Sequence, residues 1–346
     1  MNTVQTPSFL IIRFSSLGDI LLLTPALRCL RREFPSAQID VVLKERYREL
    51  LAENPHVDDL ILLPDQANFA ELKELAISLR SRYQTVVDMH TGLRSFYLRS
   101  RIAASQVLKY RKQRFKRWVL VQLKGNLYPA GFTVPGAYLR ALAPLGVRDD
   151  GEGLEWLSAF KARPRFLEKL ALDKAPDAKP IAICPGASFA TKRWFDEYWA
   201  ELIQLLLASQ REIWIFGDNG DVELGQRLQD IHPLRIRNFC GSLGLLEAGV
   251  GLSCCEVAIT LDAGPSHMAA AVGVPVVTIF GPTVTAFGFR PFRIPHRVAE
   301  TSLKCRPCSH LGGKVCPLGH HRCMKDVTPA QVLALVHELW SAMPSA

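Results

Sequence analysis

Short apolar runs alternate with amphipathic stretches along the first half of the chain. Residues 9–14 form an apolar run that is interrupted only by Arg13, and helix-period apolar positions follow over 20–34. A short apolar run is typical of a buried strand, whereas apolar positions three and four residues apart indicate a helix with one buried face. The same reading predicts further strands over 38–45, 58–64 and 84–90, and further helices over 46–53 and 69–80.

The alternation restarts near residue 180, after a stretch of different composition. Residues 148–180 are polar, poorly periodic and interrupted by prolines, which favours a linker. Beyond it, strands are expected over 180–186, 212–217, 256–262 and 275–281, and helices over 192–209, 222–231 and 267–274. Such alternation predicts an α/β protein with parallel sheets. We therefore expect two doubly wound, Rossmann-like domains, residues 1–165 and 166–346, facing a central cleft at the carboxyl ends of their strands.

The composition is that of a soluble globular protein. With 346 residues, 48% hydrophobic and 22% charged, the chain can bury one or two cores. No run of about 18 apolar residues is present, so no membrane-spanning helix is expected. The N-terminal residues lack the basic segment and small-residue cleavage site of a secretory signal, which favours a cytoplasmic location.

Positive charge is concentrated in one stretch of the chain. Lysine and arginine number 42 against 33 aspartate and glutamate, and no acidic residue occurs between Met89 and Arg148. This excess favours an anionic partner, such as nucleic acid, a phosphorylated substrate or an acidic membrane surface. The basic residues in the first part of the stretch are Arg94, Arg99, Arg101, Lys109, Arg111, Lys112, Arg114, Lys116, Arg117 and Lys124.

The loop after the first expected strand carries a candidate catalytic group. Residues 15–19 read SSLGD, not the GxGxxG of dinucleotide-binding folds, which disfavours a nicotinamide-dependent dehydrogenase. Gly18 would allow a tight turn, and Asp19 would place a carboxylate in the first turn of the following helix. Asp19 is then either an ordinary charge at a helix N-terminus or a general base that accepts a proton from a hydroxyl nucleophile.

Two loops of the second half favour a phosphate ligand. Residues 184–194 run from a strand end to a helix start and carry Lys192, so they offer backbone N–H groups and a cation. A surface turn with solvated charges is the alternative. Residues 261–283 lead from a strand end into a helix rich in small residues, whose N-terminus suits a pyrophosphate. The candidate positions there are Asp262, Gly264, Ser266 and His267.

Three blocks of the sequence carry a resemblance to a known family. Residues 9–35, 185–194 and 261–283 resemble, in this order, the signature blocks of the bacterial heptosyltransferases, the ADP-heptose:lipopolysaccharide glycosyltransferases. The resemblance covers nearly the whole chain. It implies the GT-B architecture, with the acceptor on the N-terminal domain and the nucleotide sugar on the C-terminal domain. The two-domain α/β expectation from periodicity agrees with it.

The resemblance also implies roles for individual residues. Asp19 matches the catalytic base, and Lys192 matches a cation that stabilises charge on the leaving pyrophosphate. Asp221 stands where the family usually has a glutamate that binds ribose. The positions expected to bind the donor are Gly186, Ser188, Thr191, Lys192, Asp221, Asp262, Gly264, Ser266 and His267. Those expected to bind the acceptor are Gly18, His90, Arg94, Arg111, Arg114 and Arg117.

The function implied by the resemblance is inverting transfer of heptose from ADP-heptose to the inner core of lipopolysaccharide, with no cofactor required for catalysis. The protein would act peripherally at the cytoplasmic face of the inner membrane, and no nucleic-acid partner is expected. A fold does not fix the substrate, so a GT-B glycosyltransferase that uses another nucleotide sugar is one alternative. A non-catalytic protein that binds nucleotide or nucleic acid is the other.

Four of the nine cysteines cluster near the C-terminus, close to several histidines. Paired cysteines near histidine can bind a structural zinc ion, and loop thiols that hold no metal are the alternative. The other five cysteines lie in apolar runs, where a free cysteine behaves as a small hydrophobic residue. The candidate metal ligands are Cys305, Cys308, Cys316 and Cys323.

Overall fold

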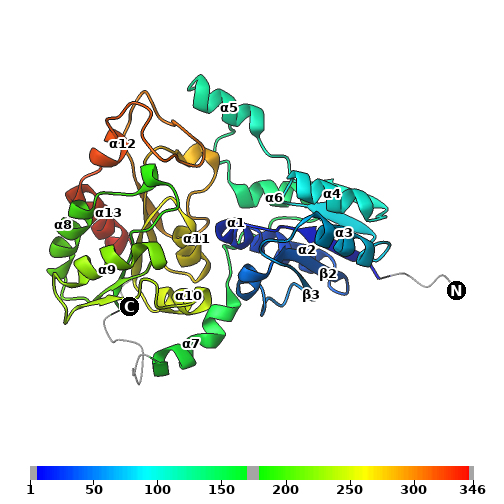
Figure 1. Cartoon of the computed structure of the whole chain (residues 1–346), viewed down its shortest axis with the longest axis horizontal. Coiled ribbons are helices and arrows are strands. Elements are labelled where there is room, and N and C mark those ends of the chain that lie inside the picture. Colours follow the sequence, from blue (N-terminus) through cyan, green and yellow to red (C-terminus); the bar gives the residue numbers. More distant parts are fainter. Residues whose placement is uncertain (1–5, 170–178, 343–346) are drawn as a thin grey trace. The chain divides into compact units, whose positions relative to one another are not determined.

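The computed structural model describes residues 6–169 and 179–342 (Figure 1). Contacts between residues group the chain into two compact units, each containing one sheet. The expected boundary at 165/166 falls inside helix α7 (Leu157–Lys169), and the basic segment 114–133 groups with the second unit. The first unit comprises Met1–Gln113, Val134–Glu152 and Trp156–Ser158, and the second comprises Arg114–Thr133, Gly153–Glu155 and Ala159–Ala346.

The first unit is built on a five-stranded parallel sheet with the order β3-β2-β1-β4-β5. Strand β1 (Ser8–Ile12) lies in the middle, where its apolar side chains are buried on both faces. The strands are completed by β2 (Gln38–Lys44), β3 (Asp59–Leu63), β4 (Thr85–Asp88) and β5 (Gln106–Lys109). The helices are α1 (Leu17–Leu21), α2 (Thr24–Glu33), α3 (Phe69–Ser78), α4 (Leu93–Arg101) and α6 (Val134–Leu142), with 3-10 turns at Glu45–Leu50 and Ala143–Leu145.

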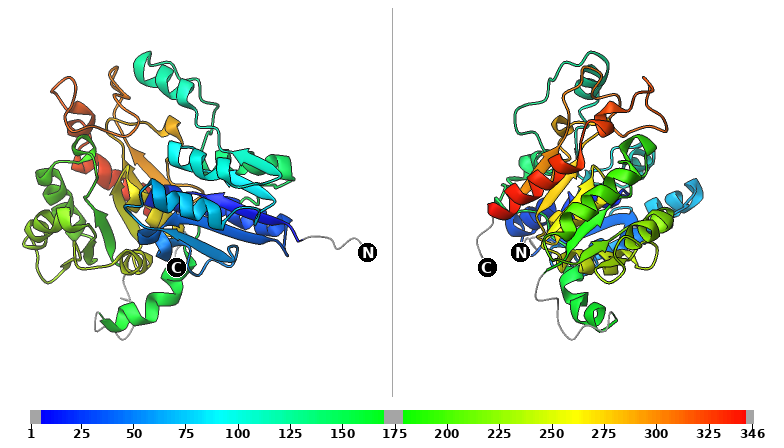
Figure 2. Two further views of the ribbon diagram at one scale, coloured as in Figure 1. Left: turned by 45° about the vertical axis from the view of Figure 1, so that its right-hand side comes forward. Right: turned by 90° about the vertical axis from the view of Figure 1, so that its left-hand side faces the viewer.

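The second unit is built on a six-stranded parallel sheet with the order β11-β10-β9-β6-β7-β8, and Figure 2 shows helices on both sides of it. Its strands are β6 (Ile181–Cys184), β7 (Ile213–Ile215), β8 (Ile236–Asn238), β9 (Val257–Leu261), β10 (Val276–Ile279) and β11 (His296–Ala299). Its helices are α5 (Arg114–Gln122), α8 (Asp196–Leu207), α9 (Val222–Gln229), α10 (Leu245–Ser253), α11 (Gly264–Ala271), α12 (Arg322–Lys325) and α13 (Pro329–Ser341), with 3-10 turns at Ala190–Lys192, Asn219–Asp221 and Thr285–Phe287.

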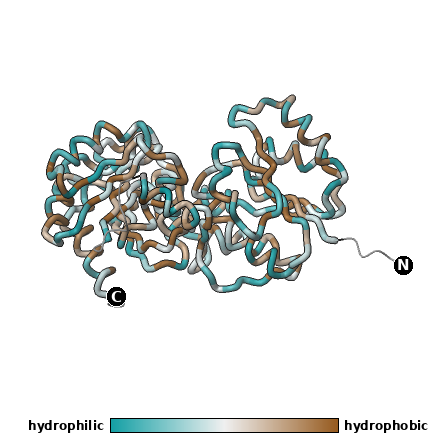
Figure 3. Tube along the Cα trace, turned by 90° about the horizontal axis from the view of Figure 1, so that it is seen from below, coloured by the Kyte–Doolittle hydropathy of each residue, from teal (hydrophilic) through white to brown (hydrophobic). Residues whose placement is uncertain are grey.

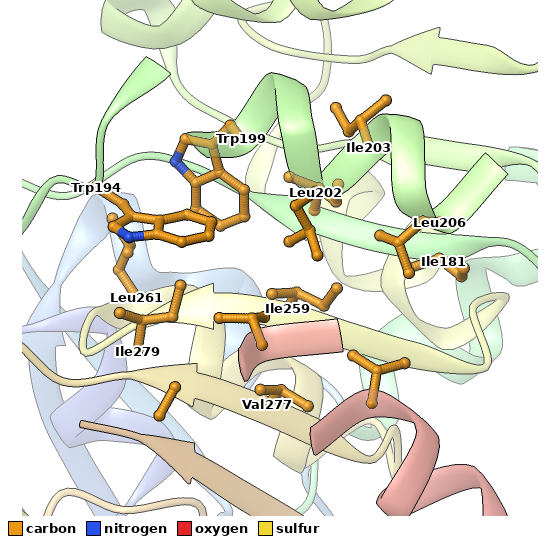
Figure 4. Packing of buried hydrophobic residues seen from close by; sticks show 14 of the residues in the cluster. Ile181, Trp194, Trp199, Leu202, Ile203, Leu206, Ile259, Leu261, Val277 and Ile279 are labelled. Atoms are coloured by element: carbon orange, nitrogen blue, oxygen red, sulfur yellow. The ribbon is translucent and has the colours of Figure 1, made fainter. Parts of the chain in front are cut away.

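The core of the second unit lies between its sheet and helices α8 and α13 (Figure 4). Trp194 and Trp199 meet edge to face with ring centroids 4.9 Å apart, a favoured geometry for aromatic pairs. The indole N–H of Trp194 donates to the carbonyls of Met324 and Val327 at 3.2 and 3.0 Å. Trp194 and Trp199 therefore fix the loop before α8, which contains Lys192.

Hydropathy along the trace follows the alternation expected from the sequence. Hydrophobic and hydrophilic segments alternate in both units (Figure 3). Among the described residues, no helix combines the length and the apolar character needed to cross a bilayer. The predicted α/β class with two parallel, doubly wound sheets is confirmed.

Two expected helices and the expected linker differ in detail from the structure. The helix expected over 20–34 is broken between Leu21 and Thr24, where the Thr24 hydroxyl donates to the Leu21 carbonyl at 2.8 Å and proline follows as the second residue of α2. Proline lacks the N–H that a continuous helix would need at that position. The helix expected over 46–53 is a 3-10 turn that ends at Leu50. The expected linker 148–180 contains α7, and its residues 170–178 lie outside the described part.

Candidate functional site

The first unit places its candidate residues at the carboxyl ends of β1 and β4. The chain leaves β1 toward β2 on one side and leaves β4 toward β5 on the other. Such a point of divergence is where open parallel sheets bind ligands. Helix α1, which follows β1, carries Asp19 in its first turn, and the loop after β4 carries His90.

Asp19 is held in a fixed geometry and remains reachable. Its Oδ2 accepts from the Ser16 hydroxyl at 2.9 Å and lies 2.5 Å from Nη2 of Arg13. The Asp19 side chain is 23% exposed, against 6% for Arg13. An ion pair with arginine favours the charged form of a carboxylate. The ion pair thus favours the carboxylate form of Asp19, and its exposed part can be approached by a hydroxyl ligand.

Arg13 and Tyr138 are the buried neighbours of Asp19. The second guanidinium nitrogen of Arg13 donates to the Met89 carbonyl at 2.6 Å, and the guanidinium lies 5.7 Å from the ring centre of Tyr138. Burial opposes the charge on Arg13, but Asp19 and Tyr138 outweigh it, so the pKa of Arg13 is raised. Neither residue was predicted from the sequence to have a role. The one available sign was a single arginine in the otherwise apolar run of residues 9–14.

His90 is a neutral neighbour of this cluster. Its ring packs at 5.0 Å from Phe14, and burial, followed by the charges of Arg13 and Lys112, lowers the pKa of His90 to about 4. The imidazole is therefore uncharged near neutral pH. It can offer one hydrogen bond donor and one acceptor to a ligand.

The arginines expected at the acceptor site are spread over both units. Arg94 donates to the Ala67 carbonyl at 2.5 Å, and Arg111 is exposed in the first unit. Arg114 and Arg117 lie on α5 in the second unit. The structure groups these two with the residues expected to bind the donor, so a shared role in acceptor binding stays a prediction.

The second unit repeats the arrangement at β6 and β9. These strands are neighbours, and the chain continues from them to opposite sides of the sheet. The loop after β6 contains Ser188, which is exposed, and ends in a 3-10 turn at Lys192. The loop after β9 contains Asp262 and leads into α11. Both predicted phosphate loops therefore meet at one switch point.

Lys192 and Asp262 form the centre of this second cluster. Nζ of Lys192 lies 2.7 Å from Oδ2 of Asp262 and donates to the Asp262 carbonyl oxygen, also at 2.7 Å. The Thr283 hydroxyl donates to the same carboxylate at 2.5 Å. Both partners are mostly buried. Asp262 consequently fixes the ammonium group, a function that the sequence alone did not separate from direct ligand binding.

The start of α11 offers backbone donors, whereas its side chains face inward. Gly264 is the first helical residue. The Ser266 hydroxyl lies 3.1 Å from that of Thr278 on β10 and is buried, and the buried ring of His267 lies 6.3 Å from that of Phe289. A helix N-terminus attracts anions through its free N–H groups and dipole. Direct donor contacts of Ser266 and His267 stay predictions.

Asp221 is buried against the glycines that end β6 and β7. Burial raises the pKa of Asp221, and Arg193 pairs with it at 3.2 Å. A Cβ atom at Gly186 would overlap the Asp221 carboxylate, and one at Gly217 would lie 2.7 Å from its Cβ. Asp221 therefore packs close to the loop expected to hold the donor. Its binding of ribose stays a prediction.

This packing gives a test of Gly186. The Gly186→Ala variant is expected to lose about 1–3 kcal/mol of unfolding free energy, because the new methyl group must displace the buried carboxylate. Urea denaturation measures the loss. Gly244→Ala is the control, since its Cβ would make only an ordinary contact at 3.7 Å. Equal stability of the two variants would contradict the close approach.

The cysteine-rich segment, residues 305–323, packs on the loop that carries Lys192. Thr191 and Gly313 exchange backbone and hydroxyl hydrogen bonds of 2.8–3.1 Å, and a ring nitrogen of His321 lies 2.9 Å from the Thr191 carbonyl. The Thr191 hydroxyl is thereby used within the protein. The segment helps to set the position of the neighbouring Lys192.

Three of the four cysteines of this segment line a small cavity. Cys308, Cys316 and Cys323 line a space of about 40 Å³, and burial raises the pKa of the Cys323 thiol to about 11. Within residues 6–169 and 179–342, however, no three Cys or His ligand atoms of this segment lie within 4.8 Å of one another. The donor set suits zinc, but the thiols would have to move closer together to bind it.

The chain is similar to known proteins in both sequence and fold. The sequence profile of glycosyltransferase family 9 (heptosyltransferase) matches residues 73–318. The chain is 25% identical to lipooligosaccharide heptosyltransferase 2 of Haemophilus influenzae, over 96% of this chain and 99% of that protein. It is 26% identical to lipopolysaccharide heptosyltransferase 2 of Salmonella typhimurium, over 96% and 98%. Its fold is similar to that of the Escherichia coli ADP-heptose lps heptosyltransferase II, with a TM-score of 0.72, 23% identity and coverage of 96% and 98%.

Proposed function

This chain belongs to glycosyltransferase family 9, the heptosyltransferases, and on that premise we propose that it transfers a heptose from ADP-heptose to the inner core of lipopolysaccharide. The observation that carries the proposal is the reachable Asp19 carboxylate at the switch point of the first sheet. A second switch point, with Lys192 beside the start of α11, supplies the positive field that a sugar diphosphate requires.

The proposed reaction is a single displacement. Asp19 accepts the proton of the acceptor hydroxyl while that oxygen attacks the anomeric carbon of the heptose from the face opposite the phosphate. The bond between the anomeric carbon and the phosphate oxygen breaks, and ADP leaves with the electron pair. The configuration at the anomeric carbon is therefore inverted.

Charge on the departing ADP is met by the second unit. Lys192 is already oriented by Asp262, whose carboxylate Thr283 holds in turn, so little reorganisation is needed when negative charge develops. The N–H groups at the start of α11 add a fixed dipole. These groups replace the stabilisation that a metal ion would otherwise provide, and no cofactor is required in this scheme.

The location follows from the acceptor in the same proposal. Lipopolysaccharide precursors are held in a bilayer by their lipid, so the protein works as a peripheral protein at the cytoplasmic face of the inner membrane. No nucleic-acid partner is part of this scheme.

A donor screen tests the function directly. Purified protein is incubated with a truncated-core lipopolysaccharide and with each of several nucleotide sugars, and the released nucleoside diphosphate is measured. ADP-heptose is expected to give the highest kcat/KM. A higher value with another nucleotide sugar would favour a different donor, and no turnover with any donor would favour a non-catalytic role.

Any metal in the cysteine-rich segment is proposed to be structural zinc, because four cysteines leave no open coordination position for substrate or water. Metal analysis of protein purified without chelator measures occupancy. Chelation or Cys308→Ser is expected to lower the melting temperature, whereas Leu234→Ser, at an exposed position of the same unit, is the control and should leave it unchanged. Loss of activity on chelation, with the segment still folded, would contradict a structural role.

A further inference from the structure

We propose that helix α5 and the cysteine-rich segment together form a docking surface for an anionic lipid bilayer. This inference rests on the proposed function, because that function brings the protein to a lipid-borne acceptor. The docking surface is defined by the apolar side chains of Phe115, Trp118, Leu123, Leu311, Val315 and Leu318, all of which are exposed and belong to the second unit.

Helix α5 exposes aromatic side chains that its own packing does not use. Phe115 and Trp118 are 69% and 54% exposed, and their rings stack with centroids 6.4 Å apart. One turn away, Val119 and Leu120 are buried and supply the contacts that hold the helix. Burial of an aromatic side chain is strongly favourable. Two adjacent rings that stay exposed in the folded protein therefore indicate contact with an apolar medium outside it.

The cysteine-rich segment lies beside the end of α5 and also exposes apolar side chains. Lys124, just beyond α5, donates from Nζ to the Pro307 carbonyl at 2.8 Å, which ties the two segments together. Val315 is 76% exposed, and Leu311 and Leu318 are also exposed. In Figures 1 and 2, α5 and the orange segment project from the same end of the second unit.

The residues around the exposed rings select a negatively charged surface. Arg114, Lys116 and Arg117 flank Phe115 and Trp118 along α5, and no acidic residue lies between Met89 and Arg148. Tryptophan and phenylalanine beside arginine and lysine are typical of helices that lie in the interface of anionic membranes. The basic side chains attract lipid head groups while the rings enter the region between head groups and acyl chains.

Two other occupants fit the surface less well. A symmetric second copy would bring identical cationic helices together, which like-charge repulsion opposes. Single-stranded nucleic acid would stack on the aromatic rings, but the aliphatic side chains of Leu123, Leu311 and Val315 offer no such platform. An acyl-chain region accepts aromatic and aliphatic side chains alike.

Co-sedimentation with vesicles tests the docking surface without any substrate. The 346-residue chain is expected to bind vesicles of phosphatidylcholine and phosphatidylglycerol (7:3) more tightly than pure phosphatidylcholine vesicles, and to bind less tightly as salt rises. The Phe115→Ser/Trp118→Ser variant should lose about tenfold or more in vesicle affinity. Leu234→Ser, which replaces a side chain 90% exposed on the same unit, should leave binding unchanged.

Tryptophan fluorescence adds a readout that local misfolding cannot imitate. Among the described residues, Trp118 is the one tryptophan that is more than half exposed. Its emission should shift to shorter wavelength when anionic vesicles are added, because the indole leaves water. Trp118→Phe should keep most of the vesicle affinity and lose the shift.

The results separate this inference from the proposed function. Turnover of ADP-heptose with a water-soluble, delipidated core saccharide should be the same in the wild type and in Phe115→Ser/Trp118→Ser. With the acceptor embedded in vesicles, only the variant should be slow. Wild-type vesicle affinity in the variant would overturn the docking surface, as would no wild-type binding to anionic vesicles. A variant that becomes monomeric, or that loses RNA affinity, with vesicle binding unchanged would also overturn it.

Discussion

Replacement of Asp19 by asparagine is expected to lower kcat by about two to four orders of magnitude, because an amide cannot accept the proton of the acceptor hydroxyl. The shape of the side chain is kept, so Ser16 still has a hydrogen-bonding partner. ADP-heptose binding should change little, since the expected donor loops belong to the second unit. Steady-state kinetics with donor and acceptor varied separately measures both effects.

The control for Asp19→Asn must account for Arg13. Removing the carboxylate's charge leaves a buried guanidinium with less compensation, and this can lower stability. Thermal unfolding and ADP binding therefore accompany the kinetics. Ser16→Ala removes one hydrogen bond to Asp19 and keeps the carboxylate, so it should cost less than about tenfold in kcat. Near-normal turnover in folded Asp19→Asn would contradict the assignment of Asp19 as the base.

The periodicity of the sequence was sufficient to predict the layers of the fold. Strands such as β1 and β9 are buried on both faces, so they read as unbroken apolar runs, and helices such as α8 have one buried stripe. The break between α1 and α2 was missed because apolar residues continue through it. There the deciding residue is Pro25, whose effect is local.

The grouping of α5 with the second unit could not be predicted from composition. Its basic residues continue those of α4 without a change in charge, so the sequence offered no boundary. The contacts that decide the grouping join residues far apart in the chain, such as Lys124 with Pro307 and Tyr128 with Phe287. Pairings of this kind depend on side-chain packing and leave no periodic pattern.

The same limit applies to individual site residues. A polar loop after each central strand was predictable, because parallel strands bring their carboxyl ends to one edge. The direction of each side chain was not. Ser266 turns toward Thr278, and Asp262 holds Lys192, contacts that no pattern in the sequence marks. Arg13 meets the Met89 carbonyl because β1 and β4 are neighbours.

Lys192→Ala is expected to raise the KM for ADP-heptose and to lower kcat, with a combined loss in kcat/KM of about two to three orders of magnitude. One cation serves both the bound diphosphate and the charge that develops as ADP leaves, so both constants should change. Lys325→Ala, which removes an exposed lysine on α12, is the matched control and should behave as the wild type.

Loss of the ammonium group also leaves Asp262 buried without its cation, at a cost of about 3 kcal/mol in stability if the charge is retained. The Lys192→Ala/Asp262→Asn double variant separates stability from catalysis, since the neutral amide can still accept from Thr283. Its melting temperature should recover toward the wild-type value, while kcat/KM stays as low as in Lys192→Ala. If the double variant recovers activity together with stability, Lys192 acts only by holding the loop in place. If Lys192→Ala alone has wild-type kinetics, Lys192 has no role in donor binding or catalysis.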